Sequence, residues 1–66
     1  MITFDKLWKT MERKGYTTYF LREKADIDSK TIRRLKANQN IETKTLDKIC
    51  NVLDCKIEEI IEFKKS

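Results

Sequence analysis

Apolar residues recur at every third or fourth position along most of the chain, rather than at alternating positions. This spacing places them on one face of a helix and predicts an all-α protein of five short helices. The helices are expected at about residues 3–14, 18–25, 29–37, 43–53 and 57–63. Trp8 lies on the apolar stripe of the first helix, so we expect it to pack in the core rather than to bind a ligand.

Residues with strong capping and turn preferences separate the first three helices. Gly15 stands just past the first helix, where a left-handed backbone is common. Thr17 or Thr18 is expected to cap the second helix, because a hydroxyl accepts a hydrogen bond from a free backbone N–H. Asp26 is expected to adopt the left-handed conformation of a turn, which Asp tolerates better than most residues.

The most polar of the predicted helices lies in the segment DSKTIRRLKANQN, residues 28–40. Asp28 is a favourable N-cap, and Ile32 and Leu35 share the one face that can reach the core. Lys30, Arg33, Arg34 and Ala37 are expected to point away from that face, and residues 38–40 predict a loop. Such a helix is typical either of a solvated surface or of a surface that lies against something negatively charged.

The length of 66 residues is enough for one domain, over residues 1–66, and too short for two cores. The net charge is +4, and it is unevenly placed: residues 13–44 contain nine cations and four anions, whereas the residues from 45 onward contain four cations and five anions. A basic middle segment is typical of a polyanion-binding surface. Charge alone does not separate this reading from an ordinary solvated surface.

Cys50 and Cys55 lie among apolar residues and have no partner at a metal-ligand spacing. We expect them to be reduced structural thiols, as in a reducing cytoplasm. No apolar run approaches the roughly 20 residues of a membrane span, and the first residues lack the pattern of a signal peptide. The expectation is a cytoplasmic protein with no metal, no cofactor and no contact with a membrane.

An enzyme is not expected. The chain has no His, which is the usual acid or base at neutral pH. Gly15 is its single glycine and cannot form a phosphate-binding loop. The cluster of Glu58, Glu59 and Glu62 is explained by a helix N-terminus and by solubility.

The helix, turn and helix between residues 18 and 37 carry apolar residues in a recognisable order: Leu21, Ala25, Ile27, Ile32 and Leu35. This order resembles the helix-turn-helix of the Cro/C1-type repressor-like DNA-binding domains. The segment TLDKICNVLDCKIEEIIEF, residues 45–63, is similar to the fourth and fifth helices of a short branch of that family, so the resemblance covers nearly the whole chain. Arg22 and Asp26 depart from it, because the family usually has a small residue and a Gly there; the Arg22 stem is expected to extend into solvent.

In such domains the second motif helix enters the major groove with its N-terminal end leading, while the helix before it crosses the phosphate backbone. Carried over by position, the resemblance implies base contacts by Ser29, Lys30 and Arg34, of which Arg34 can donate to guanine O6 and N7. The residues implied at phosphates are Thr17, Thr18, Tyr19, Arg33, Asn38, Gln39, Asn40, Thr43 and Lys44. The alternative for each of these polar residues is simple capping or turn chemistry.

The resemblance implies a sequence-specific transcriptional regulator of double-stranded DNA, expected to act as a repressor and to need no small-molecule substrate. Because one short helix reads few base pairs, we expect a homodimer on a pseudo-palindromic operator. Its contact surface would come from the last helix, the loop before it, or the aromatics Phe20 and Phe63. The alternative on the same fold is a protein-interaction module, such as an antitoxin-like or phage-encoded adaptor, since a fold does not fix a function.

Overall fold

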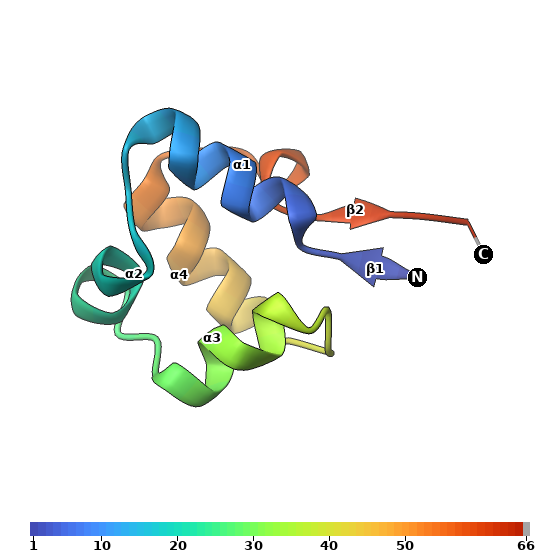
Figure 1. The fold of residues 1–66 in the computed structure, drawn as a ribbon, viewed down its shortest axis with the longest axis horizontal. Helices are drawn as coiled ribbons and strands as arrows, with labels where there is room; N and C mark the ends of the chain where they lie inside the picture. Colours follow the sequence, from blue (N-terminus) through green and yellow to red (C-terminus); the bar gives the residue numbers. More distant parts are fainter. Residues whose placement is uncertain (66) are drawn as a thin grey trace.

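The computed structural model describes residues 1–65, in which helices α1 to α4 surround a single core and the two ends of the described chain lie side by side (Figure 1). The helices are α1 (Asp5–Lys14), α2 (Thr18–Lys24), α3 (Ser29–Lys36) and α4 (Thr43–Leu53). Strands β1 (Ile2–Thr3) and β2 (Glu62–Phe63) pair antiparallel, with Ile2 opposite Phe63, and a 3-10 turn, η1 (Ile57–Glu59), precedes β2.

The ends of the first three helices coincide with the capping residues that the sequence predicts. Gly15 follows α1 with a φ of 79°, in the left-handed region. Thr17 caps α2 by accepting a hydrogen bond from the Phe20 N–H at 3.4 Å. Asp28 caps α3 by accepting from the Thr31 N–H at 2.7 Å. Local capping chemistry therefore sets where α1 ends and where α2 and α3 begin.

The core takes at least one fully buried side chain from every helix. These side chains are Leu7 of α1, Leu21 of α2, Leu35 of α3, and Ile49 and Leu53 of α4. Ile60, just after η1, is also fully buried. Trp8 packs against this cluster from a half-buried position, as expected of a core residue rather than of a ligand platform. Cys50 and Cys55 are free and half-buried at the edge of the same cluster.

The prediction of a fifth helix at residues 57–63 is wrong. Only η1 is helical, and the chain then extends into β2. Ile60 and Ile61 are β-branched, which favours extended backbone, and a single turn has little intrinsic stability. Pairing with β1 provides partners for backbone groups at both ends of the described chain. The fold is therefore mostly helical with a small sheet, rather than all-α.

The same sheet shortens the first predicted helix. Ile2 and Thr3 belong to β1, and the helix begins at Asp5, whose carboxylate lies in the first turn. An acid at that position interacts favourably with the positive end of the helix dipole. Main-chain hydrogen bonds join Met1 to Lys64 in both directions and extend the pairing beyond the strands.

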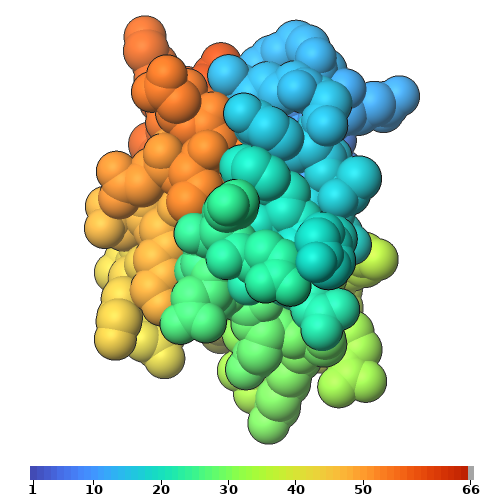
Figure 2. Space-filling model, turned by 90° about the vertical axis from the view of Figure 1, so that its left-hand side faces the viewer, coloured from blue at the N-terminus to red at the C-terminus, as the bar shows by residue number. Residues whose placement is uncertain are grey.

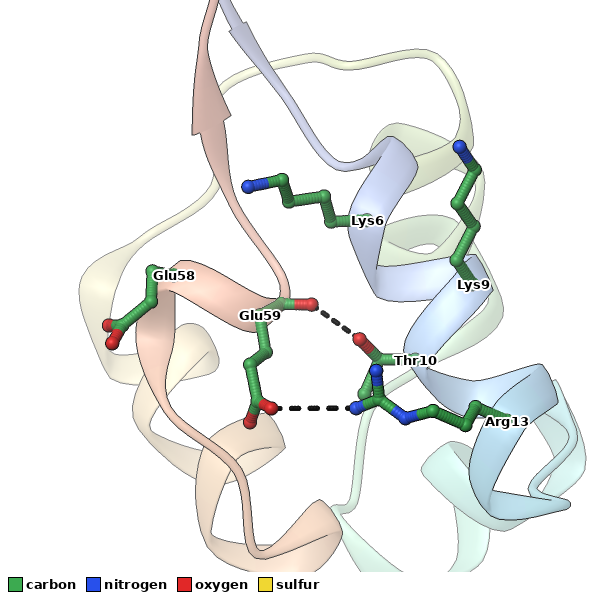
Figure 3. A pocket seen from close by; sticks show the side chains of 6 residues that line it. All are labelled: Lys6, Lys9, Thr10, Arg13, Glu58 and Glu59. Carbon is green, nitrogen blue, oxygen red and sulfur yellow. Dashed lines mark hydrogen bonds and ion pairs between the residues drawn. The ribbon is translucent and has the colours of Figure 1, made fainter.

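The turn η1 is fastened to α1 by two side chains of α1 that reach Glu59 (Figure 3). The Thr10 hydroxyl donates to the Glu59 carbonyl at 2.6 Å, and the Arg13 guanidinium pairs with the Glu59 carboxylate at 3.4 Å. Lys6 and Lys9 line the same groove but extend away from that carboxylate (Figure 3). Thr10 and Arg13 therefore join α1 to η1 through Glu59.

Two further findings concern the described residues as a group. None of their helices is long and apolar enough to cross a membrane. Within residues 1–65, no three His, Cys, Asp or Glu side chains gather in a group that could hold a metal ion.

Candidate nucleic-acid interface

A tight turn fixes the position of α3 relative to α2. The Leu21 carbonyl accepts hydrogen bonds from the N–H groups of both Ala25, at 3.0 Å, and Ile27, at 3.4 Å. Asp26 between them has a φ of 54°, which confirms the predicted left-handed turn. Ala25 and Ile27 are buried, so the turn is anchored in the core. Arg22 is exposed on α2, as expected from its departure from the family pattern.

The helix α3 presents one apolar face inward and a basic face outward. Ile32 and Leu35 are buried, at 6% and 0% exposure. The exposed side chains of the helix are Ser29, Lys30, Arg33, Arg34 and Lys36. In Figure 2 the start of α3, coloured green, forms the projection at the lower end of the molecule. The sequence prediction that this helix combines a buried pair with an exposed basic face is confirmed.

The cations of α3 have no carboxylate partner within residues 1–65. The ion pairs in this part of the chain are Arg13 with Glu59 and Lys64 with Asp5, at 3.4 and 3.2 Å, and neither involves α3. An unpaired exposed cation keeps its charge available for a ligand, because no internal anion neutralises it. The outward face of α3 is therefore suited to an anionic partner.

Asp28 is an acid at the start of α3, and its carboxylate is already engaged as the cap of the helix. The hydrogen bond from the Thr31 backbone N–H lowers the pKa of Asp28, and the positive charges of Lys30 and Arg34 lower it further. The carboxylate is therefore ionised at neutral pH and held as the cap of α3. The sequence prediction of a capping role for Asp28 is confirmed.

Three residues at the start of α2 were predicted to contact phosphates, and they differ in their surroundings. Thr17 uses its Oγ1 as the cap of α2, whereas Thr18 is half-buried and Tyr19 is 65% exposed. Phe20 is not an exposed aromatic: it is half-buried and stacks on the Tyr16 ring with centroids 4.0 Å apart. Tyr19 is therefore the aromatic side chain that α2 presents to solvent.

The loop between α3 and α4 holds the remaining candidate residues. Asn38 is half-buried with a φ of 55°, and its Oδ1 accepts from the Phe4 N–H at 2.7 Å. Its side-chain oxygen thus joins the loop to the residue before α1, which leaves only its amide NH₂ for a ligand. The other predicted residues of this region are exposed: Gln39, Asn40, Thr43 and Lys44.

A small polar hollow of about 60 Å³ brings Arg34 against this loop. Thr31 and Glu42 line the hollow with Arg34, and the sequence analysis assigned no site role to either. The spacing of three residues between Thr31 and Arg34 places both on one helix face and was the available signal for Thr31. Glu42 therefore places an acid beside Arg34 of the basic face.

Two helices joined by a tight turn, with the second presenting an unpaired basic face, define a helix-turn-helix protein. A family model described as the Cro/C1-type HTH DNA-binding domain matches residues 6–66, and the chain belongs to this family. Among solved structures the chain is similar to that of the transcriptional regulator VanUg, in crystal form II, with a TM-score of 0.90 and 29% sequence identity. The match covers 98% of this chain and 87% of that one. No curated protein matches the chain.

Proposed function

We propose that the chain is a transcriptional regulator that binds double-stranded DNA sequence-specifically, with α3 in the major groove. The observation that carries this proposal is the exposed and unpaired basic face of α3 within a Cro/C1-type domain. The likeness to VanUg, a transcriptional regulator, supports the regulatory role. An eight-residue helix is about 12 Å long, so it reaches only a few base pairs.

Base contacts are assigned to the N-terminal half of α3 and to Arg34. Ser29 and Lys30 lie in the first turn of the helix, which leads into the groove in helix-turn-helix domains. Arg34 lies one turn further along and has the planar fork of donors that matches guanine O6 and N7. Arg33 is offset from its neighbour Arg34 by about 100° around the helix and is assigned to a phosphate.

Phosphate contacts are assigned to the two segments that flank α3. On one side are the residues at the start of α2, namely Thr17, Thr18 and Tyr19. On the other are the loop and the start of α4, namely Asn38, Gln39, Asn40, Thr43 and Lys44. Hydroxyl, amide and ammonium donors of this kind fix the register of a protein on a duplex without reading its sequence.

We further propose that the chain acts as a repressor and binds as a homodimer to a pseudo-palindromic operator. A single α3 reads too few base pairs to select one site in a genome, and a two-fold pair doubles the length that is read. Asp28 at the start of α3 and Glu42 beside Arg34 support a fixed docking position, because a carboxylate repels phosphates placed near it.

The experiment that tests DNA as the partner is the salt dependence of binding, measured by fluorescence anisotropy on labelled duplexes. The logarithm of the affinity should fall linearly with the logarithm of the salt concentration, because each neutralised phosphate releases counterions. Lys44→Ala should weaken binding to all duplexes alike and reduce the slope by about 1. A flat salt response with no preference among duplexes would instead favour the protein-interaction module.

A further inference from the structure

Glu42 is an exposed acid next to the basic face of α3, and its carboxylate has no role in holding the fold together. It stands at the N-cap position of α4, but its side chain makes no capping hydrogen bond. The ion pairs in the described part of the chain are Arg13 with Glu59 and Lys64 with Asp5, and neither includes Glu42. The carboxylate is therefore available to act on a cation near it.

Arg34 is that cation, because it shares a small hollow with Glu42. The hollow has a volume of about 60 Å³, and the half-buried Thr31 and Thr45 also line it. A space of this size holds only a few water molecules, so the two opposite charges border one narrow gap. Asp28 is also in the electrostatic field of Arg34, but its carboxylate is already held by the Thr31 N–H. Glu42 is therefore the acid with free acceptors on the side of Arg34.

The guanidinium of Arg34 has more donors than one base can use. Arg carries five N–H donors, and guanine accepts from two of them through O6 and N7. The other donors can be directed to a carboxylate, which fixes the plane of the guanidinium. A carboxylate in this place also repels a phosphate that approaches Arg34. Both effects direct Arg34 to a base edge rather than to the phosphate backbone.

We infer that Glu42 is a positioning residue for the base contact of Arg34, holding its guanidinium in the orientation that reads guanine. The inference rests on the proposed function and deepens it. It also separates the two neighbouring arginines of α3, because Arg33 is not among the residues that line the hollow. Glu42 belongs to the start of α4, which lies beside α3 (Figure 1), so the preference of α3 for a base depends on a second element.

The test measures the affinity of the wild type and of Glu42→Gln for two duplexes by fluorescence anisotropy. One is the duplex that the wild type enriches from a random pool, and the other has a single base pair changed at the position where Arg34→Ala loses preference. Glu42→Gln should reduce the ratio of the two affinities about three- to tenfold. Its affinity for the changed duplex should be equal or higher, because a charge that repels phosphates has been removed.

Three further variants show whether Glu42 acts through Arg34. In an Arg34→Ala background, Glu42→Gln should change the ratio no further. Glu42→Asp keeps the charge and should retain most of the preference. Glu12→Gln is the matched control: it also raises the net charge by one, lies on the exposed side of α1, and should leave the ratio unchanged. Thermal melts of all variants should stay close to that of their parent, because an exposed carboxylate without a capping bond stabilises a fold little.

The outcomes separate this inference from the proposed function. If the wild type distinguishes the two duplexes but Glu42→Gln leaves the ratio unchanged, the inference is overturned and the proposed function stands. An equal loss of affinity on both duplexes, or the same fall in the ratio with and without Arg34, would also overturn it, since Glu42 would then act independently of Arg34. If the wild type prefers no duplex, the proposed function fails, and the inference fails with it.

Discussion

At the scale of single residues, Asp28 is the N-cap of α3, and its pKa responds to two cations of the basic face, Lys30 and Arg34. Its lowered pKa means that the ionised carboxylate stabilises the fold above the ordinary pKa of 3.8, and that this contribution is lost as the pH falls through the lower pKa of the folded state. We expect Asp28→Ala to lower Tm at neutral pH, and the gap to the wild type to narrow in acid. Asp28→Asn keeps an acceptor for Thr31 and should lose less.

Thermal melts followed by circular dichroism across this pH range measure the effect for all three proteins. A gap between Asp28→Ala and the wild type that is as large in acid as at neutral pH would show that the carboxylate charge is not what stabilises the helix start.

The two cysteines yield a second prediction at this scale. Burial raises the pKa of both thiols, and that of Cys55 from 9.0 to about 11. Since only the thiolate reacts, the folded state should hold Cys55 about 100-fold less reactive than an unperturbed thiol near neutral pH. Alkylation followed by mass spectrometry, in the folded chain and in urea, measures this difference.

Peptide mapping in the same experiment assigns each alkylation to Cys55 or to Cys50, and the wild type is used because the neighbouring Cys50 thiol contributes to the raised pKa of Cys55. Equal alkylation rates in the folded and unfolded chains would contradict the prediction. Because the thiol pKa is raised on folding, the corresponding stability is present below the ordinary value of 9.0 and declines as the pH rises beyond it.

At the scale of elements, two buried threonines allow a matched test of how η1 is held. The Thr10 hydroxyl donates to the Glu59 carbonyl, so Thr10→Val leaves that carbonyl without its partner and should lower the free energy of unfolding by about 1 to 2 kcal/mol. Thr3 is as buried as Thr10, but its Oγ1 has no hydrogen-bond partner within residues 1–65. Thr3→Val should therefore be neutral or stabilising.

Urea unfolding of both variants compares the two sites under one condition. If Thr10→Val and Thr3→Val lower the free energy of unfolding by the same amount, the prediction is contradicted. The loss would then come from replacing a hydroxyl by a methyl group, and not from breaking the hydrogen bond between Thr10 and Glu59. The pairing of residue types makes the comparison direct, because both changes keep a β-branched side chain of nearly the same volume.

The elements also show which parts of the fold were predictable from the sequence. The ends of α1, α2 and α3 follow from side chains that act on their own neighbourhood, such as Gly15, Thr17 and Asp28. The sheet did not follow, because Ile2 and Phe63 are at opposite ends of the described chain and the apolar spacing near Phe63 also fits a helix. The link from Asn38 to Phe4 was missed for the same reason: a loop residue was read from its own sequence context alone.

The part of the candidate site that lies on α3 was predictable from the sequence. The spacing of Ile32 and Leu35 determines which face of α3 is buried, and hence that Lys30 and Arg34 are exposed. The roles of Thr31 and Glu42 depend on how α3 packs against the start of α4, which periodicity does not describe.

At the scale of the whole molecule, the described cations differ in whether an internal anion pairs with them. The exposed cations of α3 have no carboxylate partner within residues 1–65, whereas the groove between α1 and η1 holds the ion pair of Arg13 and Glu59 (Figure 3). The basic face of α3 is therefore well suited to a polyanion. We propose that α3 reads base pairs there, with Arg34 as its main discriminating residue.

The most direct test is selection of bound duplexes from a random pool, carried out in parallel with the wild type, Arg34→Ala and Lys44→Ala. The wild type should enrich a two-fold symmetric motif. Arg34→Ala should lose preference at one base pair of each half-site, a change of about 1 to 3 kcal/mol, while Lys44→Ala should select the same motif more weakly. No enrichment by the wild type, or an unchanged motif with Arg34→Ala, would contradict the account.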